Sequence, residues 1–212
     1  MNVITRLTAF TDFGASWILW LLISLSVVAI AVVIERAVLF STSRDDIPRL
    51  RNELRNLLGR GQTDAARRKL EESPSFEARV AAAGLDADGI ASAEERMQSE
   101  TELARISMEK NLALLGTLGN NAPFVGLLGT VIGIVRAFRE LEHSTGQVSA
   151  GLMSEIGEAL VATAAGLLVA LPAVAFFNLY QRLIRTRLGR AGALCHEILA
   201  FRKSEPLAQA AE

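Results

Sequence analysis

The chain has 212 residues, a formal net charge of −1, and a composition that is 50% hydrophobic and 21% charged. A single cysteine and two histidines exclude a disulfide-bonded scaffold and a metal site built from histidine and cysteine. The balanced charge gives no indication of nucleic-acid binding. The mean hydropathy of +0.31 is high for a chain with this many charges, so charged and apolar residues must be separated along it.

Three long stretches contain no charged residue, and these are residues 13–34, 111–135 and 159–181. Because a helix rises about 1.5 Å per residue, about 20 apolar residues cross the hydrocarbon core of a bilayer. The first stretch is too long for a signal peptide and has no small-residue cleavage site. We therefore expect an all-α integral membrane protein with three transmembrane helices, at residues 17–40, 111–138 and 158–181.

Lys and Arg residues collect on the cytoplasmic side of membrane proteins. Residues 35–111 contain 13 of the 22 basic residues and residues 182–212 contain six, whereas residues 1–16 contain one. This distribution predicts that the N-terminus is outside and the C-terminus inside. The segments between the spans are then an external N-terminus (1–16), a cytoplasmic helical region (41–110), an external loop (139–157) and a cytoplasmic helical tail (182–212).

The cytoplasmic region is predicted to be a series of helices. Asp45-Asp46-Ile47-Pro48 is a helix start, with acidic caps and a proline in the first turn. A leucine stripe follows, formed by Leu50, Leu54, Leu57 and Leu58, before Gly59 and Gly61 end the helix. We expect two further helices near Thr63–Glu72 and near Ser75–Leu85.

The last cytoplasmic helix is expected to begin at Ser92-Ala93-Glu94-Glu95, which is typical of a capping box. No Gly or Pro interrupts the chain from there to Gly116, which predicts one helix running unbroken into the second span. The third span has no helix breaker between Pro172 and Gly189, so its helix should extend into the cytoplasm. We therefore expect the helices of the spans to continue beyond the bilayer.

The second and third spans each carry a face of small residues. In the second span these are Gly119, Ala122, Gly126, Thr130, Gly133 and Ala137, and in the third Ala159, Thr163, Gly166 and Ala170. Small faces allow helix backbones to approach closely. The two threonines are polar, which plain packing explains less well, although each hydroxyl can also bond the carbonyl four residues back on its own helix.

Glu158 is the carboxylate at the outer end of the third span. An ionisable group at a membrane span is unfavourable and is by default a functional candidate. The alternative is an acid near the start of a helix, stabilised there by the helix dipole. Both interpretations of Glu158 stay open from the sequence.

Two long motifs resemble those of a known family. Residues 122–133, with Phe138 following them, look like the second-span signature of the ExbB/TolQ family, the larger stator subunits of bacterial proton-driven motors. Residues 158–173, with Asn178, look like its third-span signature, and Glu35-Arg36 also resembles the family. More distantly the chain is similar to the flagellar stator MotA, which has four spans. Asn120 and Asn121 depart from the family pattern, where less polar residues are frequent.

The resemblance implies a stator subunit in the bacterial inner membrane, driven by the proton-motive force. Family members form a ring, typically a pentamer, around two copies of a single-span partner resembling ExbD or TolR, whose span carries a proton-binding aspartate. The ion path would be lined by Thr130, Thr163 and Glu158. Residues for helix packing around the pore would be Gly126, Gly129, Gly133, Gly166, Pro123 and Pro172. The motor would serve TonB-type transport, Tol-type envelope constriction or gliding motility. The first span, which is rich in Leu, Ile and Val and has two Trp near its outer end, is expected from its composition to face lipid.

Two other functions are weighed against a stator. One is a membrane scaffold that conducts no ion and docks cytoplasmic partners. The other is an intramembrane enzyme, but no nucleophile and base share a span, and Cys195 and His196 lie in the tail. We expect no enzymatic activity, catalytic residue, metal or cofactor.

Overall fold

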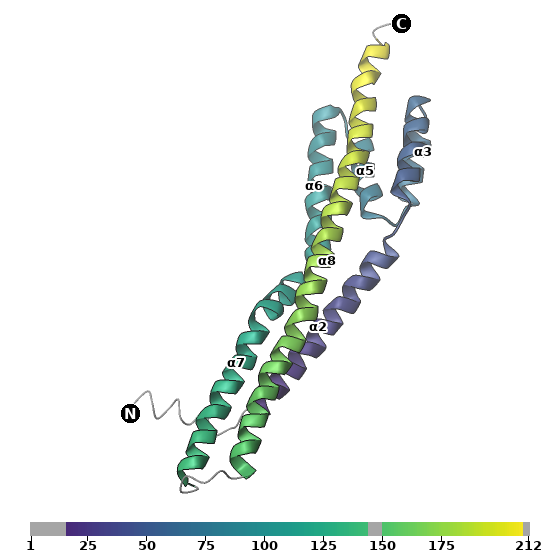
Figure 1. Cartoon of the computed structure of the whole chain (residues 1–212). Helices are drawn as coiled ribbons and strands as arrows, with labels where there is room; N and C mark the ends of the chain where they lie inside the picture. The colour runs from purple at the N-terminus through teal and green to yellow at the C-terminus, as the bar shows by residue number, and fades with distance from the viewer. Residues whose placement is uncertain (1–15, 144–149, 210–212) are drawn as a thin grey trace. The chain divides into compact units, whose positions relative to one another are not determined.

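The structure is a computed structural model that describes residues 16–143 and 150–209 (Figure 1). All regular secondary structure in these two ranges is α-helical, in agreement with the predicted fold class. The helices are α2 (Ser16–Thr42), α3 (Ile47–Gly59), α4 (Thr63–Glu71), α5 (Phe76–Leu85), α6 (Ile90–Glu109), α7 (Leu112–His143) and α8 (Ala150–Gln209).

Three of these helices, α2, α7 and α8, contain segments long and apolar enough to cross a membrane. With 60 residues, α8 rises about 90 Å, roughly three times the thickness of the hydrocarbon core. The expectation that this helix continues well beyond the apolar stretch is therefore confirmed. The sidedness of the spans stays a prediction.

The predicted external loop at residues 139–157 is mostly helical where the structure describes it. Residues up to His143 belong to α7, and α8 begins at Ala150. Residues 144–149 and the N-terminal residues 1–15 lie outside the described residues.

The chain divides into two compact units. The first contains residues 1–34 and 111–178, and the second contains residues 35–110 and 179–212. The first unit thus holds nearly all of the charge-free sequence, and the second holds most of the charges. The separation of charge along the sequence corresponds to a separation into structural units.

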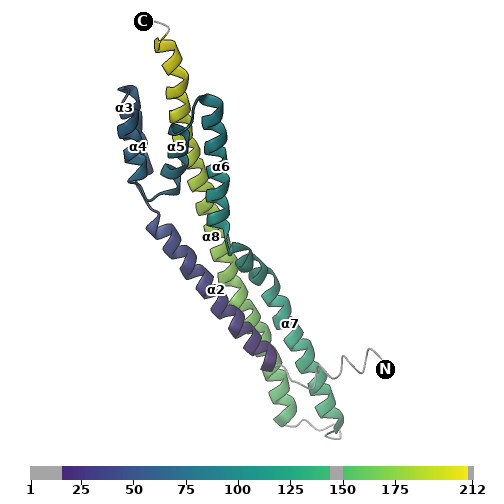
Figure 2. The ribbon, with the colours of Figure 1, turned by 180° about the vertical axis from the view of Figure 1, so that it is seen from behind.

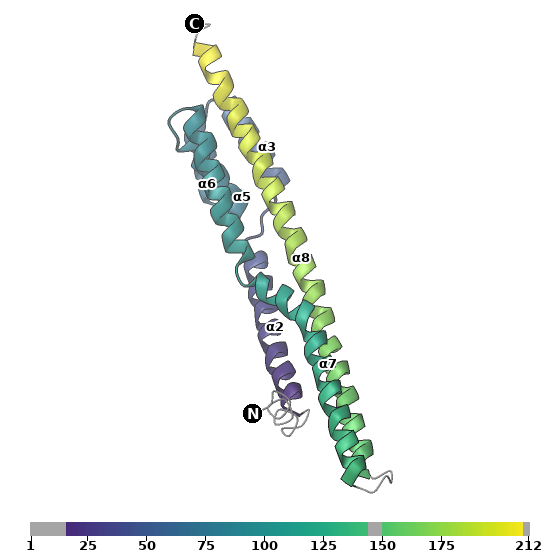
Figure 3. The ribbon, with the colours of Figure 1, turned by 90° about the vertical axis from the view of Figure 1, so that its left-hand side faces the viewer.

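In the first unit, α7 lies alongside the N-terminal half of α8 in all views (Figure 1, Figure 2 and Figure 3). The N-terminal end of α2 packs against both helices. The shared core contains Ile18, Leu22, Ala122, Ile132 and Ala170. Three helices thus contribute to one apolar cluster within this unit.

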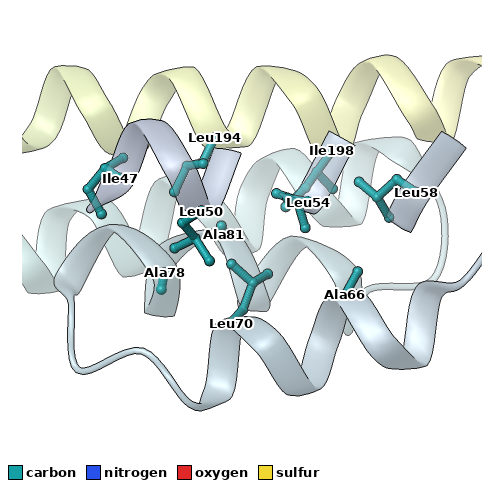
Figure 4. Close-up of a cluster of buried hydrophobic side chains, with 10 residues drawn as sticks. All are labelled: Ile47, Leu50, Leu54, Leu58, Ala66, Leu70, Ala78, Ala81, Leu194 and Ile198. Atoms are coloured by element: carbon teal, nitrogen blue, oxygen red, sulfur yellow. The ribbon is translucent and has the colours of Figure 1, made fainter. Parts of the chain in front are cut away.

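The second unit is a small helical bundle with its own apolar core (Figure 4). The predicted leucine stripe of α3 is confirmed, since Leu50, Leu54 and Leu58 are buried and Leu57 packs at the edge. They meet side chains from α4, α5 and α8, namely Ala66, Leu70, Ala78, Ala81, Leu194 and Ile198. The predicted acidic cap of α3 is confirmed at Asp46, and Ser75 caps α5, whose predicted range also agrees.

The prediction that one helix runs unbroken into the second span is wrong. The chain leaves α6 at Lys110, and Asn111 takes a left-handed conformation with φ 63° before α7 begins. Asn tolerates this conformation better than most residues with a side chain. The guanidinium of Arg36 donates to the carbonyls of Ser107 (2.9 Å) and Met108 (3.3 Å), which lose their helical partners at the break. The buried Arg36 thereby stabilises the end of α6.

The predicted capping box at Ser92 is also displaced from the true helix start. The helix begins at Ile90, directly after Gly89, whose φ is 89°. A positive φ favours glycine, and this residue directs the chain into α6. Ser92 therefore lies inside the first turn rather than at the cap.

A second buried arginine caps the C-terminal end of α2. Arg187, from the basic cluster after the third span, donates to the carbonyls of Phe40 (2.8 Å) and Ser43 (2.9 Å) and to the Ser43 hydroxyl (2.7 Å). Its guanidinium also lies 5.3 Å from the centre of the Phe40 ring. Arg187 is therefore a structural residue of the second unit, and its charge is buried rather than free on the surface.

Glu77, in the first turn of α5, is a buried carboxylate of the same unit, with 2% of its surface exposed. Its Oε2 atom has no hydrogen-bond partner. It lies near Arg187 among apolar side chains of α5, α6 and α8, with no room for a water molecule between them. Burial raises the pKa of Glu77, while the positive charges of Arg187 and Arg190 act in the opposite direction.

Candidate ion pathway

The small-residue faces of the second and third spans pack directly against each other. A Cβ atom placed on Gly126 would lie 2.8 Å from the carbonyl oxygen of Ala162, and one on Gly166 would lie 2.7 Å from that of Ala122. Both separations are shorter than real Cβ contacts, so α7 and α8 touch through their backbones here. The predicted close packing at Gly126 and Gly166 is present within one chain.

The other two predicted packing glycines belong to the same interface. A Cβ on Gly129 would lie 2.5 Å from the Cβ of Ala162, and one on Gly133 would lie 2.5 Å from the Cβ of Ala159. Gly129 also faces Ile18 of α2, at 3.5 Å. It is therefore the glycine at which all three spans meet.

The hydroxyls of Thr130 and Thr163 meet in the middle of this interface. Their Oγ1 atoms lie 2.8 Å apart, and either can donate. Thr163 Oγ1 also lies 3.2 Å from the carbonyl oxygen of Gly126 on the opposite helix, and Thr130 Oγ1 lies 2.8 Å from that of Leu127 on its own helix. Since each hydroxyl has one proton, the pair can be satisfied within the chain and still offer free lone pairs.

Glu158 lies on α8 between the threonine pair and the end of the helix at Ala150. It is five residues before Thr163, a rise of about 7.5 Å. Its Oε1 atom accepts a hydrogen bond of 2.5 Å from the hydroxyl of Ser16, at the beginning of α2. Glu158 is half-buried and, in the described part of the chain, forms no ion pair.

The neighbouring carboxylate behaves differently. Glu155 pairs with Arg136 of α7 at 3.0 Å. The charge of Arg136 is thereby balanced by Glu155, and the partner of Glu158 among the described residues is the Ser16 hydroxyl. The alternative interpretation of Glu158, as an acid at a helix start, is wrong: α8 is already helical from Ala150, eight residues earlier, and the dipole effect fades within the first turn.

Both predicted prolines lie inside continuous helices. Pro123 is half-buried in α7, and Pro172 is exposed in α8. Proline has no amide hydrogen, so the carbonyls of Gly119 and Leu168 receive no helical hydrogen bond from these positions. Neither proline ends its helix. A role of Pro172 in packing would need a contact from outside the chain.

The sulfur and imidazole groups of the tail add no reactive site. Cys195 and His196 lie on α8 within the second unit. Burial raises the pKa of the Cys195 thiol to about 11, which keeps the thiol protonated at neutral pH.

Sequence reasoning found the threonine pair and Glu158 but missed their nearest partners. Ser16 lies 142 residues from Glu158 in the sequence, and no periodic pattern connects them. The ion pair of Arg136 with Glu155 could not be predicted from the sequence either, although both are charged residues near apolar stretches.

Comparisons with known proteins agree with the geometry. The MotA/TolQ/ExbB proton channel family matches residues 69–191, which include Thr130, Glu158 and Thr163. An ExbB-like biopolymer transport protein of Helicobacter pylori is 34% identical over 171 residues, covering 81% of this chain and 79% of that protein. TolQ of the Tol-Pal system of Pseudomonas aeruginosa is 35% identical over 119 residues, covering 56% of this chain and 52% of TolQ.

The fold also resembles that of a solved structure. MotAB of C. jejuni matches with a TM-score of 0.67, covering 96% of this chain and 90% of that chain at 16% identity. This likeness concerns the fold alone. Family match, relatives and helical architecture agree, and the chain belongs to the MotA/TolQ/ExbB proton channel family.

Proposed function

We propose that the protein is the ring-forming stator subunit of a motor in the bacterial inner membrane, driven by the proton-motive force. It would assemble as a homo-oligomer, typically a pentamer, around a dimer of a single-span partner resembling ExbD or TolR. The spans formed by α7 and α8 would line the interior of the ring, and α2 would face lipid. The protein would act without enzymatic chemistry of its own.

The observation that supports this function most directly is the hydroxyl pair of Thr130 and Thr163. It lies among closely packed glycine and alanine residues of the two helices. About 7.5 Å further along α8 is Glu158, a carboxylate that forms no ion pair in the described part of the chain. A proton path across the hydrocarbon core needs titratable or water-holding groups at depth. The described spans supply hydroxyls but no central carboxylate, which the aspartate of the partner would provide.

The partner's aspartate would exchange its proton close to the threonine pair. The lone pairs of Thr130 and Thr163 can accept a hydrogen bond from a protonated carboxyl or from water. Glu158 would deliver protons from the outer side of the membrane. The protons would move the ring against the partner and so energise TonB-type transport, Tol-type constriction or gliding motility.

A non-conducting scaffold is the second candidate function, and one observation favours it. The threonine hydroxyls can satisfy each other and the Gly126 carbonyl, so they could serve helix packing alone. The two functions differ in whether the hydroxyls are needed for ion flow.

The double variant Thr130→Val, Thr163→Val tests this difference, because valine keeps the shape and removes the hydroxyls. The purified complex with its partner would be placed in liposomes, and proton uptake would be followed with a pH-sensitive dye. We expect uptake to fall about tenfold or more while the native mass of the complex is unchanged. Wild-type uptake by the double variant would support a packing role and contradict the proposed path.

A further inference from the structure

The face of α7 that points away from α8 changes its chemistry along the helix. In its later part the exposed residues are apolar, with 68% exposure at Phe124, 54% at Leu127 and 52% at Val131. In its earlier part the exposed residues from position 117 onward are polar, namely Thr117, Asn120 and Asn121, and they follow the exposed Ala113 and Leu114.

These polar residues lie at membrane depth in the predicted span. They follow Asn111 by six to ten residues, a rise of about 9–15 Å along a charge-free stretch. Amide groups at that depth are unfavourable against lipid unless they are hydrogen-bonded. Either another helix or water must therefore cover this part of α7.

The hydrogen bonds of these residues leave oxygen atoms free. Asn121 donates its amide Nδ2 to the carbonyl of Thr117 on its own helix, at 2.8 Å, so its side-chain oxygen points elsewhere. The side chain of Asn120 has no hydrogen-bond partner in the part of the chain that the structure describes. Pro123 adds a backbone acceptor, because it cannot donate to the carbonyl of Gly119. Oxygen acceptors are the groups that hold water and hard monovalent cations.

These polar residues lie where they could extend the proposed ion path beyond the threonine pair. Asn120 lies ten residues before Thr130, which is about 15 Å along the helix and about 80° around it. Glu158 lies on the other side of the threonine pair, since Gly133 faces Ala159 while Gly119 faces Val174 on the antiparallel α8. Within this unit the order along the helices is therefore carboxylate, hydroxyl pair, amides.

We propose that Thr117, Asn120 and Asn121 form a water-filled station that holds a hydrated monovalent cation at the end of the ion path opposite Glu158. The ion part of this inference rests on the proposed function, whereas the presence of water does not. The opposing possibility is that the amides bond across to a helix of a second copy and stay dry.

Thiol reactivity tests whether the station is wet. Cys195, the only cysteine, would be replaced by alanine, and Asn120→Cys would be compared with Leu127→Cys in the complete complex in membrane vesicles. Leu127 is a matched control because it lies two turns further along the same exposed face. The probes are a cationic trimethylammonium methanethiosulfonate and an anionic sulfonate methanethiosulfonate, with modification followed by intact mass.

We expect Cys at position 120 to react with the cationic reagent at least about tenfold faster than Cys at position 127, because thiolates form only in water. Cys at position 120 should also react faster with the cationic reagent than with the anionic reagent, because the oxygen acceptors around it favour cations. Equal slow reaction at both positions would show dry amides and overturn the proposal. Equal fast reaction at both positions would overturn a discrete station, and equal rates with the two reagents would overturn its preference for cations.

Ion flow provides the second measurement. Asn120→Leu combined with Asn121→Leu should reduce proton uptake by the reconstituted complex about tenfold, and Asn120→Ser should retain most of it, since serine keeps a water-binding group. Unchanged uptake in the leucine variant would remove the station from the path. If wild-type complex shows no uptake, the proposed function fails, and the thiol reactivity still decides whether the site holds water.

Discussion

Glu158 differs from the other carboxylates near the spans in the partner that it has. Glu155, one turn away on α8, is neutralised by Arg136, whereas Glu158 accepts a hydrogen bond from the Ser16 hydroxyl. A hydroxyl stabilises a carboxylate less than a guanidinium does. In the described part of the chain Glu158 is therefore held by a hydroxyl and not in an ion pair.

This role predicts distinct effects for two substitutions of Glu158. Glu158→Gln removes the proton-binding group and should lower ion-coupled output about a hundredfold, whereas Glu158→Asp should retain part of it. Both would be measured as proton uptake at equal amounts of assembled complex. Glu140→Gln, an exposed residue of α7, is the control and should not change uptake. Full uptake by the Glu158→Gln variant would exclude Glu158 from the path.

Glu77 gives a prediction about the pH dependence of stability. Burial raises its pKa in the folded protein, so between its unfolded and folded pKa values the folded state binds more protons than the unfolded state. The free energy of unfolding should then decrease as the pH rises above the unfolded pKa and level off above the folded pKa.

Glu77→Gln should remove this decrease and raise the stability at pH 8, by about 2–4 °C in midpoint temperature for each kcal/mol gained. Thermal unfolding of the purified protein at pH 5 and pH 8 measures both effects. The control is Glu95→Gln, on the exposed surface of α6. A Glu77→Gln variant that is less stable than wild type at pH 8 would show that the charged form is stabilised instead.

At the residue scale, the sequence was sufficient for groups whose spacing is periodic. Thr130 and Thr163 could be placed on small-residue faces because those faces repeat at helical intervals. The two arginine caps could not be predicted, because Arg36 and Arg187 bind carbonyls 71 and 144 residues away. Backbone carbonyls carry no sequence signal, so such contacts become visible only in three dimensions.

At the scale of helices, the break between α6 and α7 shows the limit of counting glycines and prolines. Asn111 takes a left-handed conformation without being glycine, and Arg36 compensates the carbonyls that the break exposes. By contrast, the start of α3 was predictable because Asp46 and Pro48 signal a helix start locally. Local sequence signals thus located most helix ends. They missed the end of α6, because the hydrogen bonds that stabilise it come from Arg36, a residue far away in the sequence.

The contact between α7 and α8 predicts opposite outcomes for two glycines of α8. Gly166→Ala would place a methyl group 2.7 Å from the carbonyl of Ala122, and forcing the helices apart should cost about 1–3 kcal/mol. Gly157→Ala meets no atom within 4 Å and should be neutral or stabilise the helix by up to about 1 kcal/mol. Thermal unfolding of the two variants in one detergent compares them directly. Equal midpoint temperatures would contradict backbone contact at Gly166.

At the scale of the whole molecule, the two compact units follow the separation of apolar and charged sequence. The charge-free stretches form one unit, and the region with most of the basic residues forms the other together with the tail of α8. A single chain exposes large apolar side chains along α2, α7 and α8, including Trp20, Phe124 and Leu168. Lipid, further copies and a partner helix can each cover part of this surface, and sequence periodicity does not distinguish among them.

We propose that this chain conducts protons only together with a single-span partner that has a membrane aspartate. Proton uptake into liposomes under an imposed membrane potential measures this claim directly, for the chain alone, for the chain with its partner, and for the chain with a partner whose aspartate is changed to asparagine. We predict uptake only with the unaltered partner. Equal uptake by all three samples, or none with the unaltered partner in an assembled complex, would contradict proton conduction that depends on the partner's aspartate.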